Sequence, residues 1–545
     1  MTETARPWWK GAVIYQIYPR SFQDTTGTGI GDLNGITERL GYIADLGVDA
    51  IWISPFFKSP MKDYGYDVAD YRSVDPMFGS NDDFDRLIDR AHALGLKVMV
   101  DMVYAHTSNQ HAWFIESRAN RDNAKADWYV WADPRPDGTP PNNWLSVFGG
   151  PAWQWEPRRS QYYLHHFLAS QPNLNWHNPA VADAMFADTK FWLDKGVDGL
   201  RLDAISTLFS DAELRSNPPV DPANRVAEMA GAGNNPIAMQ NHIYDRDQPE
   251  MLPMFNRLRR LVEQFPSDFL LGEIADVDSI AAVAKYTRGR DRLHSGYTFQ
   301  LMQARFDAAM LKALVGRLER ELEDGWMTWS LSNHDSPRSV SRFGALPHLA
   351  GDRAALAKLL MALQLSLRGS VCIYQGEELG LTEVEIPYER LLDPWGIEFW
   401  PDFKGRDGCR TPMPWSSHDV NGGFSIVEPW LPVGPDHGAL AVDIQASDPN
   451  STLEAYRRFL AWRQNQPLLL EGDFLLRDDL ADPVFAFERS RDGQRMLCVF
   501  NLSNEARDVA IEDGWLPSDG HGFSADLRAG QMKIPAFGAF FANDR

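Results

Sequence analysis

Eight apolar, β-rich runs alternate with amphipathic stretches of helical period over the first 400 residues, and this rhythm constrains the fold more than any other feature. The runs are apolar on both faces, as strands are when a parallel sheet is covered by helices on both sides. They span residues 11–19, 48–54, 96–104, 197–205, 268–274, 295–301, 325–335 and 369–378. Eight such strands with intervening helices predict an α/β fold, a closed (β/α)₈ TIM barrel rather than an open sheet.

Capping signals mark the ends of the intervening helices. Ser80 is a favourable N-cap, an acidic first turn follows it, and Gly95 ends the segment. Asn178 and Pro179 open another predicted helix, which ends at Gly196. Both segments therefore have the length and the boundaries of barrel helices.

Three stretches depart from this rhythm and predict further domains. Residues 105–177 are rich in Trp, Pro, Asn and Gly and are too long for an ordinary loop, so we expect a small inserted domain after the third strand. Residues 381–442 are similarly irregular and predict a lid after the eighth strand. The barrel then comprises residues 1–104 and 178–466. Residues 467–545 predict a C-terminal all-β sandwich domain, with strands at 483–488, 495–502, 508–512 and 532–541.

Charge and cysteine content exclude several classes of partner. The formal net charge of −22 repels nucleic acid and anionic lipid. No apolar run of about 18 residues is present to span a membrane, and the first ten residues lack a secretory signal. The three cysteines cannot all pair and lack metal-ligand spacing. We therefore expect a cytoplasmic protein, a monomer or homodimer, with no nucleic-acid or membrane partner.

Charged residues stand at the carboxyl ends of several predicted strands. Asp101 ends the third strand, Arg201 and Asp203 lie on the fourth, Glu273 ends the fifth and Asp335 ends the seventh. Arg201 and Asp203 are two residues apart, so they project from the same side of their strand. Because active sites of such barrels lie at the carboxyl ends of the strands, we expect these side chains to converge at one mouth.

Converging carboxyls can break a glycosidic bond. One attacks or stabilises the anomeric carbon, and another stays protonated to release the departing sugar. Arg201 would keep Asp203 ionised, and the apolar residues before Glu273 would raise its pKa. Taken singly, an Arg-x-Asp pair is more often a structural ion pair and a strand-end Glu more often a helix cap. Their joint occurrence at one end of successive strands favours the catalytic interpretation.

The motifs carrying these residues resemble those of glycoside hydrolase family 13, the α-amylase superfamily, and specifically its oligo-1,6-glucosidase and α-glucosidase branch. They are residues 101–106 (DMVYAH), 199–204 (GLRLDA), 272–273 (GE), 333–335 (NHD), 171–175 (QPNLN) and 405–415 (GRDGCRTPMPW). The resemblance covers essentially the whole chain. It implies that Asp203 is the nucleophile, Glu273 the acid/base and Asp335 the transition-state stabiliser.

The resemblance also assigns a set of substrate-binding residues. His106, Arg201 and His334 would bind hydroxyls of the transferred glucose, and Tyr66 would stack under its ring. Asp63 and Arg410 would close the far end of the pocket around the terminal glucose, which implies an exo-acting enzyme. The remaining residues assigned to the substrate site are Phe148, Phe167, Gln171, Ala204 and Phe299.

The small residue next to the nucleophile bears on linkage. Ala204 resembles the α-1,4-accepting pattern of the branch, whereas Val there resembles α-1,6 preference. We expect a retaining α-glucosidase acting on maltose, short malto-oligosaccharides and sucrose, with transglucosylation as a side activity.

The alternatives are a dedicated transglucosylase or a sucrose isomerase, decided by loops around 207–245 and 380–400. A non-catalytic relative, such as the ancillary subunit of an amino-acid transporter, would carry a membrane anchor and tend to lose the acids.

Two positions depart from the family pattern. Ala105 replaces the Asn that often precedes the histidine of the first motif. In the loop that resembles a divalent-cation site, two positions usually occupied by Asn and Asp are Thr26 and Thr28. The reaction requires no cofactor, but Asp24, Asp32 and the carbonyl of Ile30 could still hold a structural Ca²⁺ or Mg²⁺ with weakened affinity.

Overall fold

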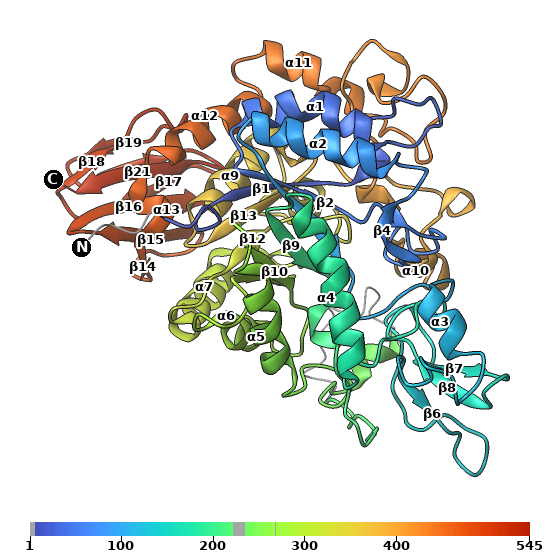
Figure 1. Cartoon of the computed structure of the whole chain (residues 1–545). Helices are drawn as coiled ribbons and strands as arrows, with labels where there is room; N and C mark the ends of the chain where they lie inside the picture. Colours follow the sequence, from blue (N-terminus) through green and yellow to red (C-terminus); the bar gives the residue numbers. More distant parts are fainter. Residues whose placement is uncertain (1–5, 222–234, 267–268, 545) are drawn as a thin grey trace.

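The computed structural model describes residues 6–221, 235–266 and 269–544, and its centre is a parallel β-barrel (Figure 1). Each of the eight predicted runs contains one strand; Asp268, at the start of the fifth run, lies outside the described residues. The strands are β1 (Val13–Ile17), β2 (Ala50–Ile53), β5 (Lys97–Met102), β9 (Gly199–Leu202), β10 (Leu270–Glu273), β11 (Ser295–Tyr297), β12 (Thr328–Ser330) and β13 (Ser370–Tyr374). Their order is β11-β10-β9-β5-β2-β1-β13-β12. A parallel bridge between Gly296 and Met327 joins the two edges, so the barrel is nearly closed, as predicted.

The two faces of each barrel strand enter different apolar clusters. Ile14 of β1 packs with Trp52, Met99 and Leu271 inside the barrel. Its neighbour Tyr15 packs outward, in the large cluster that the helices share. Every residue of β1 is buried, which explains why the strand lacks a polar face.

Helices cover the outside of the barrel (Figure 1). They are α1 (Leu33–Leu46), α2 (Asn81–Ala93), α4 (Pro179–Asp194), α5 (Met251–Val262), α6 (Ser279–Thr287), α7 (Ala308–Leu322), α8 (Ser339–Gly344), α9 (Arg353–Ser366) and α12 (Thr452–Gln464). Both predicted helix starts are confirmed: Ser80 forms a capping box with Asp83, and the Asn178 side chain caps α4. Across the described residues, no helix is long and apolar enough to cross a membrane.

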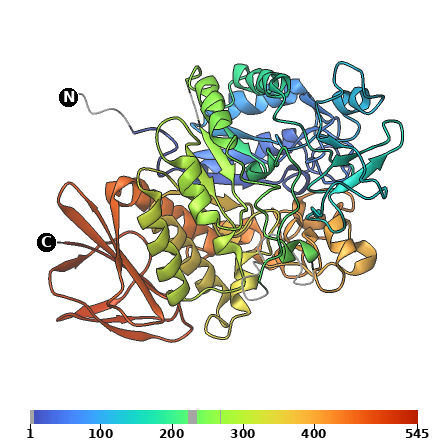
Figure 2. The ribbon, with the colours of Figure 1, turned by 90° about the horizontal axis from the view of Figure 1, so that it is seen from below.

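The chain between β5 and α4 builds a small antiparallel sheet, as expected for an inserted domain. Its strands pair in the order β6-β8-β7. The elements are α3 (Ala112–Ser117), β6 (Trp131–Ala132), β7 (Trp153–Glu156) and β8 (Gln161–Leu164); a separate hairpin of β3 (Phe57–Lys58) and β4 (Asp70–Val74) follows β2. In both views the β6–β8 sheet and the C-terminal sheets lie at opposite ends of the molecule (Figures 1 and 2).

The segment after β13 is mostly irregular, as predicted for the lid. Its short helices are η6 (Glu377–Leu379), η7 (Tyr388–Arg390), α10 (Pro394–Glu398), η8 (Asp407–Cys409), η9 (Val420–Gly423), η10 (His437–Leu440) and α11 (Val442–Ser447). Trp395 of α10 packs against Phe148 of the inserted segment, with ring centroids 5.3 Å apart. Elsewhere the short helices are η1 (Pro19–Ser21), η2 (Ile205–Thr207), η4 (Pro236–Met239) and η5 (Gln300–Met302).

The C-terminal residues form two antiparallel sheets packed on a shared apolar cluster. After α13 (Pro467–Glu471) come β14 (Asp473–Arg477), β15 (Val484–Arg491), β16 (Gln494–Asn501), β17 (Arg507–Ala510), β18 (Trp515–Pro517), β19 (Asp526–Arg528), β20 (Gln531–Ile534) and β21 (Ala539–Asp544). The prediction of one strand over residues 532–541 is wrong, because β20 and β21 belong to different sheets. Pro535 and Phe537, the latter with φ of 52°, break the extended run between them.

Candidate active site

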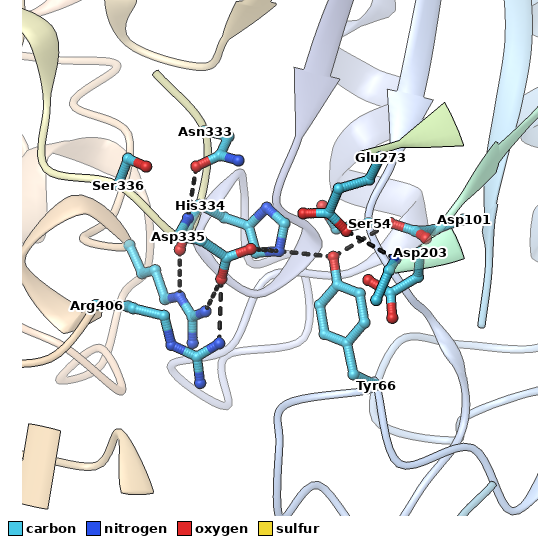
Figure 3. Close-up of polar contacts among 12 residues, drawn as sticks. Ser54, Tyr66, Asp101, Asp203, Glu273, Asn333, His334, Asp335, Ser336 and Arg406 are labelled. Carbon is cyan, nitrogen blue, oxygen red and sulfur yellow. Dashed lines mark hydrogen bonds and ion pairs between the residues drawn. The ribbon is translucent and has the colours of Figure 1, made fainter. Parts of the chain in front are cut away.

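The charged residues predicted at the strand ends meet on one rim of the barrel. Asp101 lies in β5, Arg201 in β9 with Asp203 directly after it, and Glu273 ends β10. Asp335 follows β12 in the turn before α8. Figure 3 shows the carboxyl groups of Asp203, Glu273 and Asp335 around a common space beside Tyr66. Parallel strands of a barrel present their carboxyl ends on the same face, which brings together residues far apart in sequence.

One guanidinium joins the three carboxyls of β5, β9 and β10. Arg201 Nη1 donates to Asp101 Oδ1 and to Asp203 Oδ1, each at 2.8 Å. Its Nη2 donates to Glu273 Oε2 at 2.6 Å. The arginine side chain is fully buried, and its guanidinium lies 4.9 Å from the ring centroid of Trp52. Because a guanidinium is a rigid planar fork, it holds these carboxyls at a fixed spacing.

Burial makes these carboxyls unusually weak acids. Desolvation raises the pKa of Glu273 to about 8, although Arg201 opposes the shift. The same balance raises the pKa of Asp203 to about 7 and that of Asp101 to about 6. Three carboxyls share one cation, so their simultaneous ionisation would bury excess negative charge. One proton is therefore retained in the group, and Glu273 holds it most strongly.

Asp335 has the opposite environment. Burial pushes its pKa upward, but His334, Arg406 and Arg410 outweigh that effect and hold the pKa well below the usual range. Arg410 Nη2 donates to Asp335 Oδ1 at 2.8 Å, and Arg406 Nη1 donates to the same oxygen at 3.1 Å. This carboxylate is therefore ionised throughout the neutral range.

Tyr66 and His334 connect these two groups. The Tyr66 hydroxyl lies 2.6 Å from His334 Nε2 and donates to Asp101 Oδ2 at 3.1 Å. His334 Nδ1 lies 2.7 Å from Gln16 Nε2; because an amide nitrogen donates, Nδ1 accepts and the ring proton is assigned to Nε2. Burial holds the pKa of His334 well below its usual value, so the ring is neutral. Its Nε2 is also 3.1 Å from Asp335 Oδ2.

A second charged cluster surrounds Asp63. Arg406 Nη2 donates to Asp63 Oδ1 at 2.9 Å, and Gln171 Nε2 donates to Asp63 Oδ2 at 3.0 Å. Burial raises the pKa of Asp63 to about 6 against the effect of Arg406. The Gln171 amide nitrogen also lies 3.0 Å from His106 Nε2, and burial lowers the pKa of His106 to about 3. His106 is therefore a neutral hydrogen-bonding group.

Arg406 forms the ion pair with Asp63, whereas Arg410, which the sequence assigned with Asp63 to the far end of the pocket, contacts other groups. Arg410 is only 1% exposed, and its Nε donates to the carbonyl of His334 at 2.7 Å. Both arginines belong to the 405–415 motif, but η8 lies between them and turns them toward different neighbours. Motif spacing alone does not distinguish the two.

A cavity of about 510 Å³ opens over the carboxyl groups of Asp203, Glu273 and Asp335, which are called the carboxyl trio below. Most of the predicted substrate-site residues line it: Asp63, Tyr66, His106, Phe148, Phe167, Asp203, Ala204, Glu273, Phe299 and Asp335. Gln171, Arg201, His334 and Arg410 are not among the lining residues. They lie behind the wall and hold lining side chains in place through the hydrogen bonds given above.

Sequence reasoning missed several residues of this site. Trp395, Phe403 and Arg406, from the region predicted as a lid, line the cavity, and Arg246 does so from the loop before α5. No periodicity marks these irregular segments. Tyr297 was signalled only by its place in the sixth strand; its hydroxyl accepts a hydrogen bond from Arg201 Nη2 at 2.8 Å. Of the predicted acceptor loop at 207–245, residues 222–234 lie outside the described residues.

Two further contacts hold Arg406 in place. Asp393, fully buried at the start of α10, accepts hydrogen bonds from the Arg406 backbone N–H at 2.8 Å and from Arg406 Nη2 at 2.7 Å. The guanidinium also lies 5.1 Å from the ring centroid of Phe148. The lid and the inserted domain therefore both position this arginine.

In the loop that resembles a cation site, Asp24 already has hydrogen-bond donors on both carboxylate oxygens. Oδ1 accepts from the backbone N–H groups of Thr26 and Gly27, both at 2.9 Å. Oδ2 accepts from Gly29 N at 2.8 Å and Ser425 Oγ at 2.7 Å. The charge of Asp24 is thus stabilised by neutral protein donors, and its pKa is lowered because these hydrogen bonds outweigh desolvation.

The other loop residues are similarly engaged. Asp32 Oδ1 caps α1 by accepting from Gly35 N at 2.7 Å. Thr28 Oγ1 lies 3.1 Å from Thr26 Oγ1 and 3.4 Å from the carbonyl oxygen of Ile30. In the described part of the chain, no group of three or more His, Cys, Asp or Glu residues could hold a metal ion. This conformation does not fit a divalent cation without breaking these hydrogen bonds, and cation binding remains a prediction.

The sequence is similar to known glucosidases over nearly its full length. A probable α-glucosidase of Rhizobium meliloti (strain 1021) is 53% identical, over 99% of this chain and 98% of that protein. An oligo-1,6-glucosidase of Heyndrickxia coagulans is 37% identical, over 93% of this chain and 94% of that protein.

Solved structures and a family match agree with these relatives. An α-glucosyl transfer enzyme, XgtA, superposes with a TM-score of 0.96 at 53% identity and covers 99% of this chain and 100% of its own. The trehalulose synthase of Pseudomonas mesoacidophila MX-45 does so with a TM-score of 0.88 at 32% identity, with the same coverage. Residues 16–472 match the family described as alpha amylase, catalytic domain. With the fold and the carboxyl trio, these findings place the chain in the α-amylase family of glycoside hydrolases, within its α-glucosidase branch.

Proposed function

We propose that this glycoside hydrolase is an exo-acting, retaining α-glucosidase that removes glucose from the non-reducing end of short α-glucosides, with maltose preferred and sucrose also accepted. The observation that carries the proposal is the single guanidinium of Arg201 spanning Asp203 and Glu273 at the floor of the cavity. The two terminal nitrogens of the guanidinium, Nη1 and Nη2, each bind one carboxyl and so keep the two carboxyls close. Retaining enzymes need a separation of roughly 5–5.5 Å, whereas inverting enzymes need roughly 6.5–9.5 Å.

The roles follow from the two charge environments. Asp203 attacks the anomeric carbon; the bond to the leaving oxygen breaks, and that oxygen takes the proton of Glu273. Water then attacks the glucosyl–Asp203 ester, gives its proton to Glu273 and frees the aspartate. Asp335, ionised and close by, stabilises the positive charge that develops on the sugar ring. His334, Tyr66 and Arg201 hold this arrangement in place.

The Asp63–Arg406 ion pair supports recognition of a terminal glucose. Both side chains are buried and line the cavity, so they offer charged hydrogen-bond partners to hydroxyls that face away from the scissile bond. A sugar bound there would leave no path for a longer chain on that side. This arrangement favours exo action over endo cleavage of starch.

The linkage preference rests on residue 204. Ala204 lines the cavity next to the nucleophile, and its methyl group leaves room beside the scissile bond. We infer α-1,4 preference from this small side chain, by the family pattern described above. Isomaltose hydrolysis much faster than maltose hydrolysis would contradict it.

A second candidate is transfer of the glucosyl group to a sugar or alcohol acceptor. It is favoured by the likeness to XgtA, an α-glucosyl transfer enzyme, at a TM-score of 0.96. Transfer and hydrolysis share the glucosyl–Asp203 intermediate, so the acceptor side of the pocket decides between them. A mixed activity, with transfer increasing at high maltose, fits both candidates.

One experiment tests both proposals. The purified protein is incubated with maltose, sucrose, isomaltose and soluble starch, and glucose and transfer products are separated and quantified over time. We expect glucose from maltose and sucrose, little from isomaltose and almost none from starch. Rapid starch depolymerisation would exclude the exo-acting pocket, and release of β-glucose as the first product would exclude retention. Oligosaccharides longer than the substrate at low maltose would favour the transferase.

A further inference from the structure

The residue after the proposed nucleophile has an unusual backbone. Ala204 adopts φ of 40° and ψ of 43°, in the left-handed region that residues with a Cβ rarely occupy. Strained backbone of this kind persists where surrounding contacts impose it, and it often serves a function. The turn begins η2 directly after β9, on the rim that carries the carboxyl trio.

This conformation directs a backbone donor at the proposed acid. The Ala204 N–H donates to Glu273 Oε2 at 2.9 Å. Arg201 Nη2 donates to the same oxygen at 2.6 Å. Oε2 therefore receives two hydrogen bonds, and no residue within the described ranges is recorded as donating to Oε1. Glu273 lines the cavity.

An oxygen that accepts two hydrogen bonds is a poor place for a proton. In a carboxylic acid the carbonyl oxygen is the better acceptor, so two donors on Oε2 make it the carbonyl and leave the hydroxyl at Oε1. We propose that Ala204 is a positioning residue: its left-handed backbone directs an N–H at Glu273 Oε2 and thereby keeps the proton of the acid on Oε1, ready for the leaving oxygen. This inference rests on the proposed role of Glu273 as general acid.

The charged groups around Glu273 do not provide this selectivity by themselves. Arg201 and Tyr297 approach from β9 and β11, and Asp101, Asp203 and Asp335 from β5, β9 and the turn after β12. Among them only Arg201 is a cation. Its Nη2 binds Glu273, and its Nη1 is shared between Asp101 and Asp203. The Ala204 N–H is a second donor to Glu273 Oε2; it is held in a fixed position and does not titrate. It favours the ionised form of Glu273 and therefore lowers its pKa from the value that burial alone would produce.

The sharpest test removes this N–H and keeps the side chain. Ala204 is replaced by L-lactic acid through nonsense suppression, which turns the amide into an ester and keeps the methyl group. We expect the basic limb of the kcat/KM profile on maltose to move up by about one pH unit, because Glu273 loses a donor to its ionised form. We also expect kcat to fall about tenfold because the proton is no longer confined to Oε1. An unchanged basic limb in the folded ester variant would overturn the proposal.

Two controls separate this effect from a structural one. Ala275 lines the same cavity, and no hydrogen bond from its N–H is recorded among the described residues, so its lactic-acid variant should keep the basic limb of the parent. Ala204→Gly keeps the N–H and adopts the left-handed conformation without strain; it too should keep that limb. A shift of the limb in either control equal to that of the Ala204 ester would contradict the proposal.

A measurement on the unmodified enzyme removes dependence on the folding of any variant. Infrared difference spectra with ¹³C-labelled glutamate, assigned by Glu273→Gln, report the acid carbonyl of Glu273. We expect the low frequency of a doubly hydrogen-bonded carbonyl, and the frequency of a carbonyl without donors would overturn the proposal. Failure of the parent to hydrolyse any α-glucoside would instead reject the proposed function, so the two failures are distinguishable.

Discussion

The Arg201 group and the Asp335 group lie on the same barrel rim but differ in the ratio of arginines to carboxyls. Around Arg201, one guanidinium serves the three carboxyls of Asp101, Asp203 and Glu273. Asp335 receives hydrogen bonds from two arginines and lies beside a histidine, and one of these arginines, Arg406, also serves Asp63 and Asp393. All these carboxyls are largely buried, so burial does not explain the difference. The ratio of cations to carboxyls decides which group retains a proton at neutral pH.

This difference matches what glycoside cleavage requires. The carboxyl-rich group contains an acid that can give up a proton and a nucleophile that can form an ester. The arginine-rich group contains an anion whose pKa is held well below the usual range, so it can stabilise positive charge throughout the neutral range. In the proposed mechanism, carboxyl groups thus perform three different tasks, because the tertiary structure distributes three arginines unevenly among them.

The largest expected effect comes from removing the nucleophile from the carboxyl-rich group. Asp203→Asn keeps the shape but cannot attack the anomeric carbon, so we expect kcat on maltose to fall by at least about 10⁴-fold. Glucose release is the measurement, with the melting temperature as the control for folding. Near-normal turnover would show that the carboxyl-rich group is not the catalytic one.

Asp335→Asn tests the arginine-rich group and should behave differently. We expect kcat to fall about 10²- to 10³-fold through loss of charge stabilisation.

In the parent, activity should rise as Asp203 loses its proton and fall above about pH 8 as Glu273 loses its own. Because the pKa of Asp335 lies well below this range, no limb of the profile belongs to it. A profile in the parent limited by a group titrating below about pH 4 would contradict the comparison.

Arg406 and Arg410, the two arginines that contact Asp335, allow two smaller effects on the kinetic constants to be compared. Arg406 lines the cavity and pairs with Asp63, whereas Arg410 lies behind the wall. We expect Arg406→Lys to raise KM for maltose about tenfold, since lysine cannot keep the contacts with all three carboxylates of Asp63, Asp335 and Asp393. Arg410→Lys should change kcat more than KM. Equal KM values in steady-state kinetics of the two variants would show that the Asp63–Arg406 ion pair has no role in glucose recognition.

The smallest effect concerns carboxylates that have no cation partner among the described residues. Asp24 and Asp32 are held by N–H and O–H donors, and that hydrogen bonding stabilises the loop without metal. We expect chelation with EDTA to change the melting temperature by less than about 2 °C, which corresponds to about 2 kcal/mol for a domain of this size. A larger drop that Ca²⁺ or Mg²⁺ reverses would show that the loop binds a cation despite its present hydrogen bonds.

Much of the fold and of the site follows from local sequence patterns. The eight runs, the capping at Ser80 and Asn178, and the polar residues at strand ends are all local signals, and each reappears in the structure. The strand predicted over residues 532–541 was wrong because apolar character continued while Pro535 interrupted the extended backbone. The ion pair of Asp63 with Arg406 was not predicted, because two arginines in one motif are equivalent until η8 turns them apart.

The sequence by itself determined the barrel, the branch of the family and the identity of the converging carboxyls, because hydrophobic period and strand-end position are properties of short segments. Only the tertiary structure decided the charge ratios, the left-handed backbone of Ala204 and the contact of Trp395 with Phe148. These features depend on which irregular loops meet over the rim. Packing of the loops brings together residues that are hundreds of positions apart in the sequence, and no local sequence pattern predicts such contacts.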